Sequence, residues 1–274
     1  MFKHLLVLLL VTLGLTACSS QAPTQHDFSG FLGDYSRFQS VTFNDSSKGL
    51  RWVSPELRLG ERQYNSVQLL TVTVFSQVQS TQGAEILDAL TQEIENQLTA
   101  ALTEKGLLAE QPGAGVLQVE LALTGLNVSL EDFKVQEAIP LRLLISGAMA
   151  AAGERDRVVE VLIELRGRDA LTGETVVQAI RKGEGRNLKN DKEQLSQEHV
   201  RELLTTWTNQ WVDQVEQLVN REVILCENPR PEICTRIYDP TCGLKANGES
   251  QSYSNLCGAC ADPSVEAASR GACL

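Results

Sequence analysis

Alternation of apolar and polar residues predicts β-strands in the middle of the chain. In residues 117–123 every second position is Leu or Val, and Gln118 and Glu120 lie between them. This is the pattern of a strand with one face toward solvent. Residues 159–165 alternate in the same way. Residues 67–75 form an apolar, β-branched run, which is also typical of a strand. The sequence DALTGE at 169–174 predicts a turn, after which residues 175–180 return as a hairpin partner.

Two other stretches carry apolar residues at intervals of three and four, which predicts amphipathic helices. The first helix has an apolar face made of Leu87, Leu90, Ile94, Leu98 and Ala101. Gly106 is expected to end it. The second helix has an apolar face made of Val200, Leu204, Trp207, Trp211, Val215 and Leu218, and we expect both tryptophans to pack in the core. The resulting order β-α-β-β-β-α predicts an α+β fold, with a mostly antiparallel sheet and the helices on one face.

The start of the chain has the pattern of an export signal. A basic residue precedes an apolar run that is too short to span a bilayer of about 30 Å. The run ends in Leu-Thr-Ala-Cys at 15–18, which resembles the bacterial lipobox. The resemblance implies that residues 1–17 are a signal peptide and that Cys18 is lipidated, with 18–28 as the tether. Ser19 implies sorting to the outer membrane. The alternative is an ordinary secretory signal that is cut elsewhere.

Charge and composition exclude several classes of protein. The chain of 274 residues has 35 Asp and Glu against 24 Lys and Arg, a formal net charge of −11. A nucleic-acid-binding role is not expected, because binding phosphates requires clustered positive charge. A hydrophobic fraction of 42% argues against disorder. The negative charge gives no attraction to anionic lipids, so the acyl chains must provide the membrane attachment.

The seven cysteines are distributed unevenly. Apart from Cys18, all lie in residues 226–274, at Cys226, Cys234, Cys242, Cys257, Cys260 and Cys273. This predicts a separate C-terminal domain with a boundary near Leu225, small enough to need covalent stabilisation. Export leads to an oxidising compartment, so we expect three disulfides, with 15 pairings open on the count alone. The alternatives are a redox-active CxxC pair and a zinc site. The zinc site would use Cys234, Cys242, Cys257 and Cys260, but neither a metal nor a cofactor is expected.

The spacing in this segment resembles a Kazal-type serine protease inhibitor domain. The shared features are the seven residues between the second and third cysteines, the sequence YSNLC at 253–257 and the closing GAC at 271–273. The resemblance covers residues 226–274. It implies the bridges Cys226–Cys260, Cys234–Cys257 and Cys242–Cys273. The segment before Cys257 is longer than usual, and we place the insertion at the Asn-Gly turn of 247–248; Pro263 is expected to shorten the helix of this domain.

In such a domain Arg236 is the specificity residue, and the bond between Arg236 and Ile237 is the reactive bond. Thr235 and Tyr238 would line the neighbouring subsites, and Asn255 would hydrogen-bond the loop carbonyls on either side of that bond. Arg at this position suits a trypsin-like protease, whose specificity pocket has an Asp at its base. The alternative is a disulfide scaffold that inhibits nothing.

The larger part of the chain resembles an uncharacterised family of bacterial lipoproteins, known only as a domain of unknown function. The resemblance rests on SGFLGDYS at 29–36 and LRWVSP at 50–55, and it extends to about Val219. It implies no activity for the domain, which we assign to 29–225. The apolar segment 138–152 is too short to span a membrane, and we expect a buried helix or packed loop, or otherwise a surface for a partner.

The sequence contains none of the common enzymatic motifs. The sequence has no phosphate-binding loop, no HExxH and no nucleophile elbow. His199 lacks a Ser or Cys neighbour with which to act, and we expect it to be a solvated helix residue. Glu93 and Glu95 are two apart on a helix and do not face each other. The basic stretch 181–192 is interrupted by acidic residues and predicts a solvated loop, with a binding patch as the alternative. We therefore do not expect an enzyme.

These patterns predict a lipid-anchored bacterial envelope protein, at the outer membrane, whose C-terminal domain inhibits a trypsin-like serine protease. The alternative is a structural lipoprotein in which residues 29–225 dock an envelope partner and the C-terminal domain has no inhibitory activity.

Overall fold

The computed structural model describes most of the chain. The described residues are 22–43, 45–75, 81–130, 139–140, 157–189, 193–271 and 273. The predicted signal peptide and Cys18 therefore lie outside the described residues, and so does the apolar segment 138–152 apart from 139–140. In the parts that are described, no helix combines the length and the apolar character needed to cross a bilayer.

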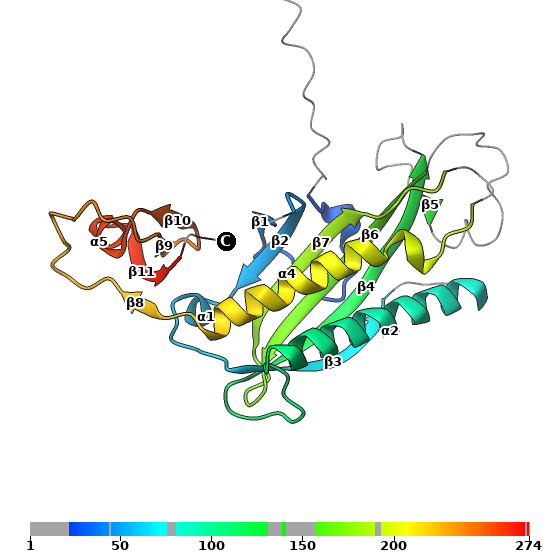
Figure 1. Ribbon diagram of the computed structural model, residues 1–274, viewed down its shortest axis with the longest axis horizontal. Coiled ribbons are helices and arrows are strands. Elements are labelled where there is room, and N and C mark those ends of the chain that lie inside the picture. Colours follow the sequence, from blue (N-terminus) through cyan, green and yellow to red (C-terminus); the bar gives the residue numbers. More distant parts are fainter. Residues whose placement is uncertain are drawn as a thin grey trace, which may run out of the picture.

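In the described residues the larger sheet has seven strands (Figure 1). They are β1 (Gln39–Thr42), β2 (Lys48–Val53), β3 (Ser66–Val74), β4 (Val116–Leu130), β5 (Ile139–Pro140), β6 (Arg157–Asp169) and β7 (Thr175–Glu184). Their order is β1-β2-β7-β6-β4-β3, and β5 pairs with β4. All neighbours are antiparallel except β3 and β4. The sheet is therefore mixed, because the helix that joins β3 to β4 returns the chain in the same direction.

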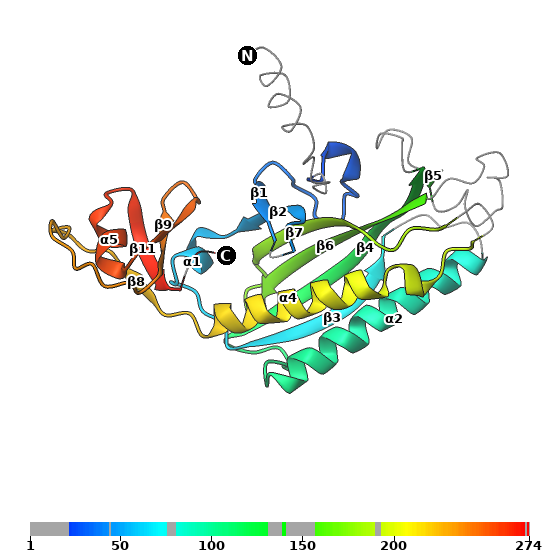
Figure 2. The ribbon, with the colours of Figure 1, turned by 45° about the horizontal axis from the view of Figure 1, so that its top comes forward.

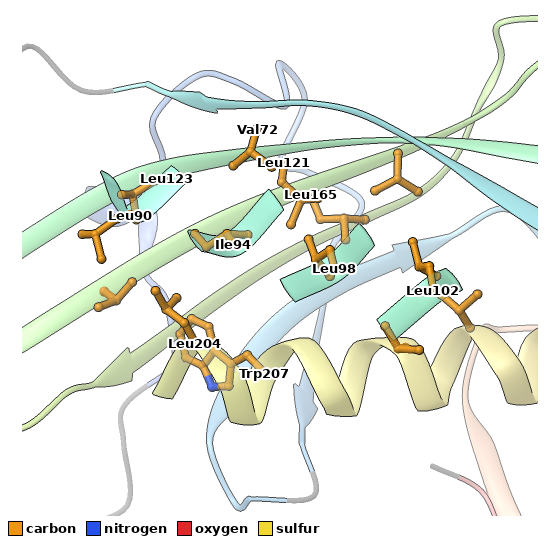
Figure 3. Close-up of a cluster of buried hydrophobic side chains, with 14 of the residues drawn as sticks. Val72, Leu90, Ile94, Leu98, Leu102, Leu121, Leu123, Leu165, Leu204 and Trp207 are labelled. Carbon is orange, nitrogen blue, oxygen red and sulfur yellow. The ribbon is translucent and has the colours of Figure 1, made fainter. Parts of the chain in front are cut away.

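Helices α2 (Thr81–Glu104) and α4 (Arg201–Val219) lie on one face of this sheet, as predicted (Figures 1 and 2). The apolar side of α2 and the sheet residues beneath it form the core, together with Trp207 from α4 (Figure 3). Trp207 is only 5% exposed, and Trp211 packs against the same cluster, so the expectation that both tryptophans belong to the core is confirmed. Gly106 has a φ of +67° just after α2, where a left-handed residue ends a helix.

The other face of the sheet is covered by the N-terminal segment, residues 24–37. The Tyr35 hydroxyl donates to Glu164 Oε2 at 2.8 Å, and the Ser29 amide donates to Glu164 Oε1 at 3.1 Å. Glu164 lies on β6 and is fully buried. The prediction that the polar side of this strand faces solvent is therefore wrong, because a distant segment of chain lies over it.

The prediction of a solvated basic loop is also wrong at its first two residues. Arg181 and Lys182 lie in β7, and both are buried. Lys182 pairs with Asp27 at 3.3 Å and with Glu160 at 3.0 Å, while Arg181 pairs with Asp45 at 2.7 Å. Buried charges require such partners, and these come from segments that the local sequence does not reveal.

Short elements complete this part of the chain. They are the 3-10 turns η1 (Gln25–Asp27) and η3 (Gln197–His199) and the helix α1 (Pro55–Arg58). Ser54 caps α1 by accepting a hydrogen bond from the Leu57 amide at 3.2 Å.

The C-terminal part forms a second sheet, in the order β10-β9-β11-β8. Its elements are β8 (Val223–Leu225), β9 (Thr241–Lys245), β10 (Ser250–Tyr253), α5 (Leu256–Ala261) and β11 (Val265–Arg270). We call residues 223–273 the C-terminal unit. It begins at β8, three residues before the first of its cysteines, so the sheet includes residues that the sequence assigned to the preceding domain.

The C-terminal unit contacts the rest of the protein around α1. Leu59 packs against the apolar cluster of this unit, which contains Leu244 and Ala267. The Arg58 guanidinium donates to the backbone carbonyls of Lys245 and Ala246. This contact places the unit beside the edge of the larger sheet formed by β1 and β2 (Figure 2).

Candidate functional site

The candidate site is the exposed loop that precedes β9. Thr235, Arg236, Ile237 and Tyr238 are all exposed, and the side chains of Ile237 and Tyr238 have exposed fractions of 67% and 79%. The loop has neither helical nor strand structure. The orange segment between β8 and β9 lies at the end of the molecule away from the larger sheet (Figures 1 and 2). A partner can therefore approach these side chains without meeting the rest of the protein.

Asn255 lies beneath the loop and holds its backbone. Its side-chain amide donates to the carbonyl of Thr235 at 3.0 Å and to the carbonyl of Ile237 at 2.9 Å. These carbonyls lie on either side of Arg236. Asn255 is 7% exposed, so the two hydrogen bonds are shielded from water. They fix the backbone around Arg236 while leaving its side chain free.

Asn255 is itself fixed because it is the N-cap of α5. Its Oδ1 accepts a hydrogen bond from the Gly258 amide at 2.8 Å. An N-cap Asn normally uses only this oxygen. Here the oxygen is held by the helix, so both amide hydrogens are directed to the loop. The side chain therefore connects the start of a helix to the backbone on both sides of one residue.

Three disulfides hold the loop and the unit around it. They join Cys226 to Cys260, Cys234 to Cys257 and Cys242 to Cys273. These are the pairs that the Kazal resemblance implies. All four sulfurs of the zinc alternative are used in these bridges, which leaves no thiolate to bind a metal.

The two ends of the loop are tied to the unit covalently. Cys234 is bridged to Cys257 in α5, and Cys242 is bridged to Cys273, which follows β11. Backbone hydrogen bonds add to this: the Asp239 amide donates to the Ser254 carbonyl at 2.8 Å. The loop is therefore fixed at both ends and at its centre.

Two features of the unit agree with expectations from the sequence. Asn247 and Gly248 form the turn between β9 and β10, with Gly248 at a φ of +90°. Helix α5 ends at Ala261, just before Pro263. The longer segment therefore forms a hairpin tip on a different part of the unit from Arg236.

Two supporting contacts were not found from the sequence. The Arg230 guanidinium donates to the carbonyls of Cys260 and Val265 at 3.2 and 2.7 Å. The Tyr253 hydroxyl donates to Asp262 Oδ2 at 2.6 Å. Tyr253 belongs to the quoted YSNLC motif, but its partner is known only once the chain has folded. These contacts fix the C-terminal end of α5, the helix whose N-cap is Asn255.

The surroundings of His199 correct another expectation. It is 3% exposed, and the predicted solvated position is therefore wrong. Its Nδ1 lies 3.0 Å from Ser196 Oγ, and its Nε2 lies 3.1 Å from Glu193 Oε1 and 3.0 Å from Arg186 Nη2. A hydrogen bond from the Lys189 amide, followed by that from His199, lowers the pKa of Glu193 to about 2.

A Ser, a His and a Glu are thus in contact, although the sequence suggested no such neighbours for His199. Both ring nitrogens are occupied, and Ser196 and His199 form a reciprocal capping arrangement around η3. The contacts tie the segment before α4 to the end of β7. We assign this cluster a structural role.

Comparison with known proteins identifies the larger domain. The family described as "Protein of unknown function (DUF3313)" matches residues 27–211. The chain therefore belongs to this family. The match ends before the first cysteine of the C-terminal unit, so the exposed loop lies outside it.

The chain is similar to the "Uncharacterized lipoprotein YdcL" of Escherichia coli (strain K12). The two are 27% identical over 194 residues, which cover 70% of this chain and 86% of YdcL. This agrees with the resemblance to a lipoprotein family of unknown function.

Two solved structures are similar at low scores. One is the PelC dodecamer from Paraburkholderia phytofirmans, with a TM-score of 0.29 and 12% identity, covering 62% of this chain and 95% of that chain. The other is described as a neuraminyllactose-binding hemagglutinin homolog from Helicobacter pylori, with a TM-score of 0.33 and 14% identity, covering 58% and 89%. These scores support no assignment of function.

Proposed function

We propose that this chain is a lipid-anchored protein of the bacterial envelope whose C-terminal unit inhibits a trypsin-like serine protease. The unit would act as Kazal-type inhibitors do, by presenting the bond between Arg236 and Ile237 to the protease. The observation that carries the proposal is the pair of hydrogen bonds from Asn255 to the carbonyls of Thr235 and Ile237. A structural scaffold has no need to fix the backbone on both sides of a single exposed arginine.

The chemistry of the loop suits this role. The Arg236 side chain is exposed and presents a planar cation, which fits an acidic specificity pocket. Ile237 and Tyr238 are also exposed and would contact the protease on the other side of the bond. A loop that is already ordered loses little conformational entropy on binding, which favours tight association.

The same rigidity would make cleavage unproductive. The bridges from Cys234 and Cys242 and the contacts of Asn255 would keep the new amine beside the acyl group after attack on the Arg236 carbonyl. Re-formation of the peptide bond would then compete with hydrolysis. A flexible loop with an exposed arginine would be cut and released.

The anchor is supported by the similarity to an E. coli lipoprotein and by the lipobox that ends at Cys18. Two or more acyl chains on Cys18 would hold the protein stably at a membrane. The residue after Cys18 is Ser, which supports the outer membrane as the destination. The inhibitory unit would then act on proteases that reach the envelope.

The test uses the oxidised mature chain with trypsin and with elastase. We expect stoichiometric, nanomolar inhibition of trypsin and none of elastase, whose specificity pocket is too small for Arg236. Arg236→Asp should abolish the inhibition, whereas Arg201→Asp, at a half-exposed position on α4 far from the loop along the chain, should leave it unchanged. Rapid cleavage after Arg236 without inhibition would reject the proposal and favour a non-inhibitory unit.

A further inference from the structure

A large cavity lies where the larger sheet, helix α4 and the C-terminal unit meet. Its volume is about 1030 Å³, just above the range of about 300–1,000 Å³ for small-molecule sites. Val53 and Val177 line it from the sheet, Trp211 and Leu218 from α4, and Leu244 from the C-terminal unit. Most of its wall is apolar, so it favours a ligand with an apolar body.

Arg51 also lines this cavity. It lies opposite Ala179 in the register of β2 and β7, and residues opposite each other in antiparallel strands share a face. Ala179 packs against the core beneath the helices. The Arg51 side chain is therefore on the helix side of the sheet, toward the cavity.

Arg51 differs from Arg58, Arg181 and Arg221, which line the same cavity. Arg58 and Arg221 donate to backbone carbonyls, and Arg181 pairs with Asp45. Among the residues that the structure describes, none makes a hydrogen bond or ion pair with Arg51. The Arg51 side chain is half-buried, and this partial loss of water lowers the pKa of its guanidinium below the usual value.

An unpaired, half-buried guanidinium in a largely apolar cavity is costly, because a charge that has lost part of its water is normally paired. Arginine stays protonated in proteins, so Arg51 cannot avoid the cost by losing its proton. Its fork of donors matches the two oxygens of a carboxylate or phosphate. A bound oxyanion would supply the partner that the chain itself does not.

We propose that this cavity binds an amphipathic anion, with its apolar chain against Val53 and Trp211 and its oxyanion on Arg51. The shared chemistry is one carboxylate or phosphate on an aliphatic tail, as in fatty acids and single-chain lipid phosphates. A neutral hydrocarbon would leave Arg51 unpaired. The net charge of −11 gives no general attraction for anions, so the selectivity must come from this site.

The three tryptophans of the chain provide a direct readout, because Trp52, Trp207 and Trp211 all line the cavity. The probes are dodecanoate, dodecyl phosphate and dodecanol, titrated below their micelle concentrations into the oxidised mature chain. We expect saturable binding of an oxyanion, and binding of dodecanol at least tenfold weaker. Whichever of dodecanoate and dodecyl phosphate binds more tightly shows whether the site prefers a carboxylate or a phosphate. Equal binding of dodecanol, or no saturable binding of either oxyanion, would overturn the proposal.

Arg51→Met tests the role of the charge. We expect it to weaken oxyanion binding at least tenfold, leave dodecanol binding unchanged and raise the unfolding temperature of the ligand-free protein, because it removes an unpaired charge. Arg201→Met, outside the cavity, is the matched control and should bind as the parent does.

If Arg51→Met is folded and binds the oxyanion unchanged, the proposal is wrong. If Arg51→Met does not fold, Ala179→Phe, which fills the cavity beside Arg51, must abolish binding for the proposal to stand. Trypsin inhibition is measured on the same variants and should be unaffected, so this proposal and the proposed function can fail separately.

Discussion

The Tyr35 hydroxyl donates a hydrogen bond to Glu164 Oε2 at 2.8 Å across a sequence separation of 129 residues. This contact fixes the N-terminal segment to a fully buried carboxylate on β6. Burial, followed by the hydrogen bond to Glu164, raises the pKa of Tyr35 above its usual value. The folded domain therefore begins within the predicted tether of 18–28, since Asp27 already pairs with Lys182 on β7.

Removal of this hydroxyl should loosen the segment. We expect Tyr35→Phe to lower the free energy of unfolding by about 1–3 kcal/mol, because a buried acceptor loses a donor. Urea unfolding measures the change, and hydrogen exchange should become faster within residues 24–37. Tyr238→Phe makes the same change at an exposed position and should have no effect. Equal stability of the two variants would show that the contact does not fix the segment.

The two functions of the Asn255 side chain can be separated by substitution. Asn255→Asp keeps an oxygen for the Gly258 amide but has no hydrogen to donate to the carbonyls of Thr235 and Ile237. We expect this variant to retain α5 yet lose inhibition and be cut faster after Arg236. Asn255→Ala should show the same loss and also a cap loss of about 1 kcal/mol. The measurements are inhibition of trypsin, mass spectrometry of the cleaved chain and thermal unfolding. Tight inhibition by Asn255→Asp would contradict the assigned role.

The contact between Tyr253 and Asp262 predicts how stability depends on pH. Hydrogen bonds from Ser264 and then Tyr253 lower the pKa of Asp262 to about 2, so its contribution is present above the usual value of 3.8 and is lost as the pH falls to 2. Burial and the bond to Asp262 raise the pKa of Tyr253 to about 12, so its contribution is present below 10 and is lost as the pH rises to 12.

We therefore expect thermal unfolding of the C-terminal unit to move to lower temperature in both pH ranges. In acid, Tyr253→Phe should weaken the loss of stability without abolishing it, because Ser264 still donates hydrogen bonds to Asp262 and lowers its pKa. At alkaline pH, Tyr253→Phe should remove the loss of stability that Tyr253 causes. The control is Tyr238→Phe, which should keep both slopes. An unchanged alkaline slope in Tyr253→Phe would show that this tyrosine does not cause it.

The core between α2 and the sheet should be sensitive to loss of volume. Leu102 is fully buried, so Leu102→Ala should lower the free energy of unfolding by about 2–5 kcal/mol. Leu171 is 69% exposed, and Leu171→Ala should change it by less than about 0.5 kcal/mol. Denaturant titration of both variants measures the difference. A small effect at Leu102 would mean that this part of the core is not closely packed.

The lipid anchor can be tested at one residue. Cys18→Ala should prevent incorporation of labelled palmitate and release the mature chain from the membrane fraction, because the body of the protein is negatively charged. Cys226→Ala is the matched cysteine control and should keep the label. Membrane retention of Cys18→Ala would contradict attachment through acyl chains.

Local patterns predicted the secondary structure well where one segment decides it. The spacing of Leu87, Leu90 and Ile94 gave α2, and the DALTGE turn gave the hairpin of β6 and β7. The β1-β2 hairpin was not predicted. Strand β1 is short, lies at the edge of the sheet and has largely exposed side chains, so it lacks the alternation that identifies a strand.

For the candidate site, the sequence indicated the loop residues and Asn255 through the Kazal resemblance. The resemblance also suggested the disulfide pairs. The contact of Tyr253 with Asp262 and those of Arg230 were missed because each partner is reached only after the chain has turned back on itself. His199 was misjudged for the same reason, since Glu193 and Arg186 meet it through the fold.

The features that depend on neighbours along the chain follow from the residue order: the helix and strand periods, the turns, the pattern of an export signal and the concentration of cysteines at one end. Which charges are buried and which are paired follows only from the folded arrangement. Lys182 is stabilised by Asp27, 155 residues away, while Arg51 on the adjacent strand has no such partner among the described residues. The two cases differ because the cost of burying a charge is set by the atoms around it in space, and the order of residues does not specify those atoms.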